Sequence, residues 1–322
     1  MIISRVTADV PVPDAPVVVG EQEQLPPQPN LSRNLTVYLT GADGSAWDLT
    51  NGPVRLMPGV SGFFPSNVEH RWNTSPMLPG AVRAGYGLGV QPVRLPVFHA
   101  ADSSVEWQEL DRALWRALSP DAPCMVTVVS PDAETRALPV WFTGVGDGAD
   151  LAQDPVAAMW ATDGLEFVAE EPFWLGSTTV QTFGTETPQP YYSPPGSPHV
   201  KTLMSNSASD QSTLRNDGDV PAWPVYAVTG PVSSFTVGIG SYRIVYGALG
   251  AGSTVWIDTH PSRQTVGYER GGNDEGAWAG VTQRGFKEVP TGAEVPFTVT
   301  LVGPGPSTSA RVELTPRYRR PW

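Results

Sequence analysis

Proline and glycine recur at short intervals along the chain, and this spacing limits what the chain can fold into. The 322 residues include 34 prolines and 33 glycines, which are scattered rather than clustered. Proline lacks the backbone N–H that helix interiors and central strands use, and glycine favours turns. The sequence therefore predicts many short strands joined by turns. Because 40% of the residues are hydrophobic, such strands can enclose proper cores.

One stretch predicts a helix, over residues 103 to 118. Ser103 and Glu106 have the spacing of a capping box, in which each side chain satisfies a free backbone N–H. Ser119-Pro120 ends the stretch, because proline disfavours helix in the residue before it. The apolar residues that follow the cap are three, four and four positions apart, which places them on one helical face: Trp107, Leu110, Leu114 and Leu118.

Alternating apolar residues predict strands in the rest of the first half. Segments 35–40 and 45–49 form an expected hairpin around a four-residue turn. A second expected hairpin joins 156–162 to 165–170 through Asp163-Gly164, a strong turn signal. The other strands expected here are 92–98, 124–129 and 137–144.

Residues 57–92 have little hydrophobic period and many prolines and glycines, which predicts a long loop. A loop of this length inside a compact domain is uncommon and is usually functional or interface-forming. Four of its residues belong to types that are enriched in protein interfaces: Phe63, Phe64, Arg71 and Trp72. They are therefore our candidates for a subunit contact, and the alternative is that they pack onto their own domain.

The second half predicts a sandwich of short antiparallel strands. Residues 176–210 are rich in serine, threonine and proline and are expected to form a loop or linker. In 295–301 the apolar residues alternate strictly with polar residues or proline, as in a half-buried antiparallel strand. The other expected strands are 223–228, 235–239, 242–246, 254–258 and 310–314, with no helix after residue 120.

The expected fold class is mainly β. An extended arm of residues 1–30 precedes a barrel-like or sandwich domain with one α-helix, residues 31–175, and a second β-sandwich, residues 176–322.

Residues 170 and 171 are two adjacent glutamates followed by aromatic residues, which suggests a sugar-cleaving site. Neighbouring residues of a strand point to opposite faces, so Glu170 and Glu171 cannot converge on one glycosidic bond. Cys124 is expected to be a buried small hydrophobic residue. None of the histidines lies four residues from another, so no metal set is expected: His70, His99, His199 and His260. The sequence predicts no catalytic residue, no cofactor and no enzyme activity.

Charge and cysteine content restrict partners and compartment. The formal net charge is −12, and such an acidic chain is not expected to bind nucleic acid along its surface. Residues 311–322 carry four arginines and one glutamate and are expected to be a strand followed by a solvated tail. A single cysteine allows no internal disulfide and favours a reducing compartment. The N-terminus has no apolar core of a secretory signal, and no 18-residue apolar stretch predicts membrane insertion.

Five segments in the same order resemble distal tail proteins of long-tailed bacteriophages, in the form found among phages of actinobacteria and called minor tail proteins. The segment 78–98 is similar to the family's glycine-rich loop and following strand around an arginine, here Arg94. The stretch 167–174 is similar to the one that closes the family's first domain. The others are 43–59, 107–144 and 214–266, the last with Ile257-Asp258 at a strand end. The arm of residues 1–30 and the segment 267–286 depart from the pattern.

The resemblance implies a structural role in the virion. Family members form a ring, usually of six copies, between the tail tube protein and the tail-tip hub, and DNA passes through the ring. It implies that the first domain builds the ring and that the second is a galectin-like β-sandwich. The protein would be made in the host cytoplasm and would reside at the tail tip. The acidic balance would suit a lumen that does not hold DNA.

A carbohydrate-binding adhesin is the alternative function. Most of the eleven tryptophans fall within expected strands or on the apolar face of the helix, where core packing explains them. Trp278 lies in the glycine-rich stretch 271–280 and would be the platform for a host surface glycan.

Overall fold

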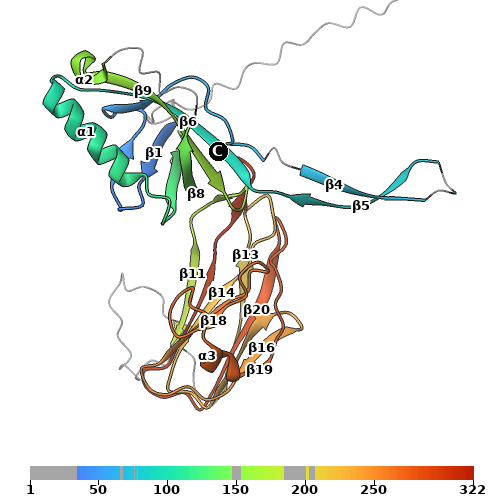
Figure 1. Cartoon of the computed structure of the whole chain (residues 1–322). Helices are drawn as coiled ribbons and strands as arrows, with labels where there is room; N and C mark the ends of the chain where they lie inside the picture. Colours follow the sequence, from blue (N-terminus) through green and yellow to red (C-terminus); the bar gives the residue numbers. More distant parts are fainter. Residues whose placement is uncertain are drawn as a thin grey trace, which may run out of the picture.

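The computed structural model describes residues 35–65, 68–75, 77, 79–146, 154–184, 201–202 and 207–322, with the backbone alone for 201–202 and 207–211. The expected arm of residues 1–30 and His199 lie outside the described residues. The fold is mainly β, as predicted, with two sheet systems and a separate projecting hairpin (Figure 1).

The N-terminal half is built on one antiparallel sheet that nearly closes into a barrel, with the strand order β2-β1-β7-β8-β9-β6-β3. Its two ends approach each other where the amide of Leu56 donates to the carbonyl of Leu49 at 2.8 Å. The expected hairpin over 35–49 and the strands at 92–98, 124–129 and 137–144 are confirmed. The bounds are β1 Thr36–Thr40, β2 Ala46–Asp48, β3 Val54–Leu56, β6 Gln91–Ala100, β7 Cys124–Val129, β8 Thr135–Val145 and β9 Trp160–Ala169.

Helix α1, Ser104–Ala117, covers this sheet and begins at the predicted cap. The side chain of Ser103 accepts a hydrogen bond from the amide of Glu106 at 3.3 Å. Trp107 and Leu114 are buried, which confirms the predicted apolar face. Cys124 is also buried, as predicted, and burial raises the pKa of its thiol.

The hairpin predicted at Asp163-Gly164 is wrong, because β9 runs straight through these residues. Asp163 pairs with Val97 and Gly164 with Pro96 of β6, so pairing with distant strands overrides the local turn signal. A Cβ on Gly164 would lie 3.3 Å from the guanidinium of Arg94, so the glycine leaves room for that side chain. The residues before the strand form a short helix, α2 Pro155–Ala158.

The C-terminal half is a sandwich of a six-stranded and a five-stranded sheet, in the orders β12-β11-β21-β14-β17-β18 and β13-β20-β15-β16-β19. Side chains of both sheets, such as Val312 of β21 and Phe297 of β20, share one buried core. The bounds are β11 Thr179–Gly184, β12 Lys201–Thr202, β13 Ser207–Arg215, β14 Val225–Thr229, β15 Ser234–Ile239, β16 Tyr242–Tyr246, β17 Thr254–Asp258, β18 Val266–Gly267, β19 Val281–Gln283, β20 Glu294–Val302 and β21 Ser309–Leu314.

Two expectations for this half are corrected. The segment 176–210 is not simply a linker, because it contains β11, β12 and the start of β13. The prediction of no helix after residue 120 is wrong, because α2 and the short helix α3, Glu275–Ala279, both follow that position. Each is shorter than two turns and has an aspartate cap, Asp154 or Asp274, so neither shows a helical period.

The end of the chain returns to the N-terminal half (Figure 1). Strand β22, Arg317–Tyr318, pairs antiparallel with β10, Trp174–Leu175, which also touches β8. The guanidinium of Arg136 lies 3.7 Å from the centre of the Tyr318 ring. The expected solvated tail is therefore wrong at Arg317, whose side chain is 13% exposed. The division into domains at 175/176 stays a prediction.

None of the helices in the described residues is long and apolar enough to cross a membrane.

Candidate functional site

The segment predicted as a long loop contains a projecting hairpin, which corrects that prediction. Strand β4, Val68–Thr74, pairs antiparallel with β5, Ala81–Leu88, in a two-stranded sheet of their own. Every residue of β4 is exposed, and the hairpin extends away from both halves (Figure 1). An isolated hairpin is marginally stable in water, so an extended one is expected to gain support from other surfaces.

A bulge in the hairpin decides which side chains share a face. Arg71 pairs with Gly85 and Trp72 with Arg83, so Ala84 is an extra residue without a partner. The bulge therefore turns Arg83 to the face of His70 and Tyr86. Two contacts on that face agree: the Nε of Arg83 donates to the Nδ1 of His70 at 3.3 Å, and its guanidinium lies 5.4 Å from the Tyr86 ring centre.

The four predicted interface residues do not lie together. Phe63 packs edge-to-face on Trp174, with ring centres 5.2 Å apart, and its carbonyl accepts from the Trp174 indole N–H at 3.1 Å. Phe64 is about half exposed and lies against Trp322. Arg71 and Trp72 are exposed on β4. Phe63 thus contacts its own domain, whereas the other three face solvent.

Sequence reasoning missed the apolar side chains of β5 and the edge of β4. Val68, Val82 and Tyr86 are exposed large hydrophobic residues, as is Met77 at the hairpin tip. In AVRAGYGL, residues 81–88, apolar residues occupy every second position from Val82 to Leu88. This period of two was a signal for a strand, but the glycines among them obscured it.

The adjacent glutamates lie where the two halves meet, and their side chains have different surroundings. The carboxylate of Glu171 accepts a hydrogen bond from the guanidinium of Arg317 at 2.8 Å and lies 3.3 Å from Nε2 of His260. Glu170 is exposed and lines a cleft of about 400 Å³ together with Trp141 and other residues. Because Glu171 is engaged by a cation, its role here is to join the halves.

Glu171, His260 and Arg317 form the joint between the two halves, and burial and neighbouring charges set the protonation of its histidine. Burial lowers the pKa of His260, and the cationic Arg263 and Arg317 lower it further, against the raising effect of Glu171. The guanidinium of Arg317 donates to Nε2 of His260 at 2.9 Å, which requires that nitrogen to be unprotonated. Burial also lowers the pKa of Arg317, and the Glu171 carboxylate opposes that shift. The joint is therefore assembled with a neutral histidine.

Metal and glycan sites receive no support from the described part of the chain. No group of three or more histidine, cysteine, aspartate or glutamate side chains there could hold a metal ion. Trp278, the candidate glycan platform, is half-buried against the sandwich core. Its indole N–H donates to Asn273 at 2.6 Å, and the guanidinium of Arg284 lies 4.7 Å from its ring centre. One face of this ring is thus already covered.

No protein-family model matches the sequence, and no curated protein matches it. The fold is similar to that of two solved phage proteins. One is the Dit protein of phage SPP1, described as a paradigm of the hub adsorption apparatus in Gram-positive infecting phages. The likeness has a TM-score of 0.55 at 12% identity and covers 88% of this chain and 99% of that one.

The second similar structure is a chain of the phage P2 baseplate in its activated conformation with Ca. Its TM-score is 0.50 at 10% identity, over 89% of this chain and 99% of that one. At these identities the likenesses show a shared fold that runs through both halves of the chain.

Proposed function

We propose that this protein is a structural component of a phage tail tip that assembles as a six-copy ring, of the type found in phages of actinobacteria. In this proposal the ring joins the tail tube protein to the tail-tip hub, and DNA passes through its centre. The shared fold supports the proposal over nearly the whole chain, because the similar proteins are a hub protein and a baseplate component.

The observation that carries the proposal is the distribution of exposed apolar side chains. Seven of the fifteen exposed large hydrophobic residues in the described structure lie between residues 64 and 90, in and beside the hairpin. A projecting, apolar, two-edged sheet is an aggregation hazard unless a partner covers it. A neighbouring copy of the same chain would supply that cover.

A hairpin that projects from one copy would contact a different surface on the next copy. Such a heterologous contact generates a closed ring when its rotation closes, and an open filament when it does not. Phe64, Arg71 and Trp72 remain candidates for this contact, and Val82 and Tyr86 join them. Phe63 would act indirectly, by fixing the root of the hairpin on Trp174.

Two substitutions with matched exposure test the assembly. Val82 on the hairpin is 70% exposed, and Val105 on helix α1 is 68% exposed. We expect the wild-type protein to show a native mass of six 34.4 kDa chains, about 206 kDa, and a ring with a central hole in negative-stain images. We expect Val82→Glu to give smaller species, because a charge would be buried in the contact, while Val105→Glu leaves the ring intact.

Two results would contradict the proposal. One is a wild-type protein that stays monomeric at high concentration and also when it is mixed with the tail tube. The other is an assembly that Val105→Glu disrupts as strongly as Val82→Glu, since ring contacts would then not depend on the hairpin.

The charge of the proposed lumen is tested separately. The chain carries a net charge of −12, and an acidic lumen would repel the DNA phosphates that pass through it. Reversal of acidic lumen residues, once images of the ring identify them, is expected to slow DNA ejection. Ejection at the unchanged rate would refute this part of the proposal.

A further inference from the structure

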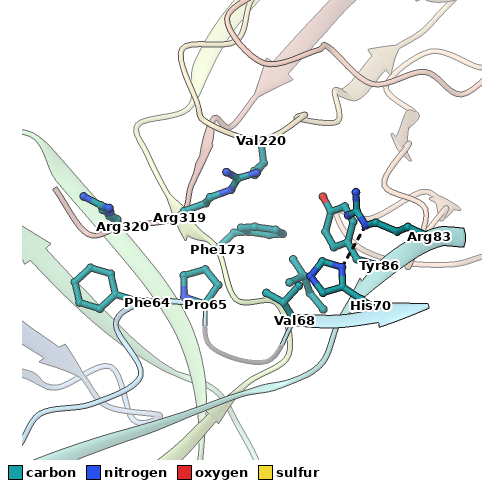
Figure 2. A pocket seen from close by; sticks show the side chains of 11 residues that line it. Phe64, Pro65, Val68, His70, Arg83, Tyr86, Phe173, Val220, Arg319 and Arg320 are labelled. Carbon is teal, nitrogen blue, oxygen red and sulfur yellow. Dashed lines mark hydrogen bonds between the residues drawn. The ribbon is translucent and has the colours of Figure 1, made fainter. Parts of the chain in front are cut away.

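A pocket lies at the root of the hairpin, where four separate parts of the chain meet: residues 64–88, Phe173, Val220 and residues 319–320 (Figure 2). Its volume is about 410 Å³. The face of the hairpin that carries His70, Arg83 and Tyr86 forms one wall. Phe173 and the end of the chain, with Arg319 and Arg320, form the opposite side.

The pocket is cationic although the protein is acidic. Three arginines line it, Arg83, Arg319 and Arg320, and the described part of its lining includes no aspartate or glutamate. Among the described residues, none of these three guanidiniums has a carboxylate partner within ion-pair distance. Arg83 instead bonds to His70, and Arg320 lies 5.9 Å from the Phe64 ring centre. The charge in this pocket is therefore available to an anionic ligand.

The floor of the pocket is apolar and aromatic. The apolar part of the lining consists mainly of Phe64, Pro65, Val68, Tyr86 and Phe173 (Figure 2). Aromatic-lined grooves are the surfaces on which proline-rich segments dock, because the extended polyproline conformation is already ordered and loses little entropy. The combination of an aromatic floor and a cationic rim selects an acidic segment that contains proline.

We propose that this pocket binds residues 21–29 of the same chain, EQEQLPPQP. Glu21 and Glu23 supply the negative charges for the arginines of the rim. Leu25 and the prolines at 26, 27 and 29 supply the apolar surface for the aromatic floor. Residues 6–32 contain no lysine or arginine, so the segment and its neighbours carry no positive charge that the arginines of the pocket would repel.

The segment can reach the pocket of its own copy. Val37 pairs with Val128, and Val128 pairs with Arg136, so the beginning of β1 lies about 10 Å from β8, two strand spacings away. The guanidinium of Arg136 donates to the carbonyl of Arg320 at 3.0 Å, at the rim of the pocket. The six residue-to-residue steps from position 29 to position 35 span up to about 20 Å, which is enough to cover this path.

Hydroxyl-radical footprinting of the full-length protein, with mass-spectrometric detection, tests the inference. The protein is diluted until it is monomeric, so that no contact between copies covers Phe64, Tyr86 or Trp72. Phe64 is 48% and Tyr86 is 54% exposed in the described structure, so an empty pocket would leave both open to oxidation. A docked segment would protect them. Trp72 is 56% exposed on the same hairpin outside the pocket and is the internal reference.

The charge of the segment is then removed without changing any residue that lines the pocket. In Glu21→Gln/Glu23→Gln we expect the oxidation of Phe64 and Tyr86, relative to Trp72, to rise about threefold, because rim ion pairs are lost. The matched control is Asp9→Asn/Asp14→Asn, which removes the same charge from another part of the arm and is expected to change nothing. Equal oxidation in all three proteins would overturn the inference, as would an equal rise in both variants.

A mixture of two variants shows whether the segment docks on its own copy. Isotope-labelled Glu21→Gln/Glu23→Gln has an intact pocket, and unlabelled Arg319→Gln/Arg320→Gln has an intact segment. We expect Phe64 and Tyr86 of the labelled chain to remain open to oxidation in the mixture. Renewed protection would overturn docking within one chain. The inference does not need the ring, so a monomeric protein would refute the proposed assembly and leave this test unaffected.

Discussion

Substitution of Arg317 by alanine should weaken the joint between the two halves. The guanidinium of Arg317 donates to the Glu171 carboxylate at 2.8 Å, to Nε2 of His260 at 2.9 Å and, from Nη2, to the carbonyl of Pro221 at 2.8 Å. Its side chain is 13% exposed and lies 5.0 Å from the Phe173 ring centre. One side chain near the end of the chain thus connects the segment before β10 with the C-terminal sandwich.

The expected loss can be worked out from these contacts. A hydrogen bond to a charged group contributes about 1.5–3 kcal/mol, and an orphaned buried partner adds to the loss when it is removed. Glu171 is 32% exposed, so water would rehydrate part of its carboxylate after the substitution. We therefore expect Arg317→Ala to lower the free energy of unfolding by about 2–3 kcal/mol, below the 3–5 kcal/mol for a fully buried pair. Arg317→Lys should lose about half of this, because lysine keeps the charge without the planar fork.

Urea unfolding at 25 °C, followed by circular dichroism, measures the difference. The matched control is Arg215→Ala, whose ion pair with Asp217 is as short, at 2.6 Å, but has side chains that are 70% and 60% exposed. An exposed pair contributes about 0–1 kcal/mol. A double-mutant cycle of Arg317→Ala with Glu171→Gln should give a coupling of about 1–2 kcal/mol. Equal effects of Arg317→Ala and Arg215→Ala would refute the assignment of this joint as a stabilising contact.

Three further outcomes follow from the geometry. The pKa of His260 is lowered from 6.5 in the folded chain, so the unfolded chain binds a proton at this residue more readily. The contribution of His260 to stability should therefore be fully present above pH 6.5 and be lost as the pH falls below it. His260→Gln should reduce this loss in denaturation curves across pH 5–7, and an unchanged slope would contradict the assignment. Gly41→Ala should cost about 1–3 kcal/mol of stability and lower the melting temperature, since its Cβ would lie 2.5 Å from that of Ala117. The control Gly247→Ala, whose Cβ would have its nearest atom at 3.7 Å, should not lower the melting temperature by a comparable amount. Trp278→Ala should lower the free energy of unfolding by about 2 kcal/mol through lost core packing, and it should not change binding to host cell-wall glycans. If the wild-type protein binds such glycans and Trp278→Ala abolishes that binding, the adhesin function is favoured instead.

The sequence predicts an element correctly where the apolar pattern of a segment is set by the core that it packs against. The helix of residues 104–117 was predicted by its cap and its apolar spacing, and Trp107 and Leu114 are buried on that face. In β20, Phe297, Val299 and Leu301 are buried, as their strict alternation indicated. In both elements the apolar period is imposed by water exclusion within the same chain, so the sequence alone carries it.

The sequence is misleading where distant segments decide the local structure. Asp163-Gly164 has the composition of a hairpin turn, but pairing with β6 keeps the strand straight. Arg317 appeared to belong to a solvated tail, yet it pairs with Leu175 and bonds to Glu171, 146 positions earlier in the chain. Contacts at such separations have no local signature, because each partner alone looks like an ordinary turn or surface residue.

The hairpin shows a further limit, since its charged face depends on a single extra residue. Arg83 and Tyr86 are three positions apart, so a regular strand would place them on opposite faces. The unpartnered Ala84 reverses this and brings Arg83 to the side of His70 and Tyr86. The alternation of the sequence would therefore assign this arginine to the wrong face of β5. The bulge brings a third guanidinium into the lining of the pocket, across from Arg319 and Arg320, and it is this arrangement that gives an acidic protein a cationic, aromatic pocket at the root of its projecting hairpin.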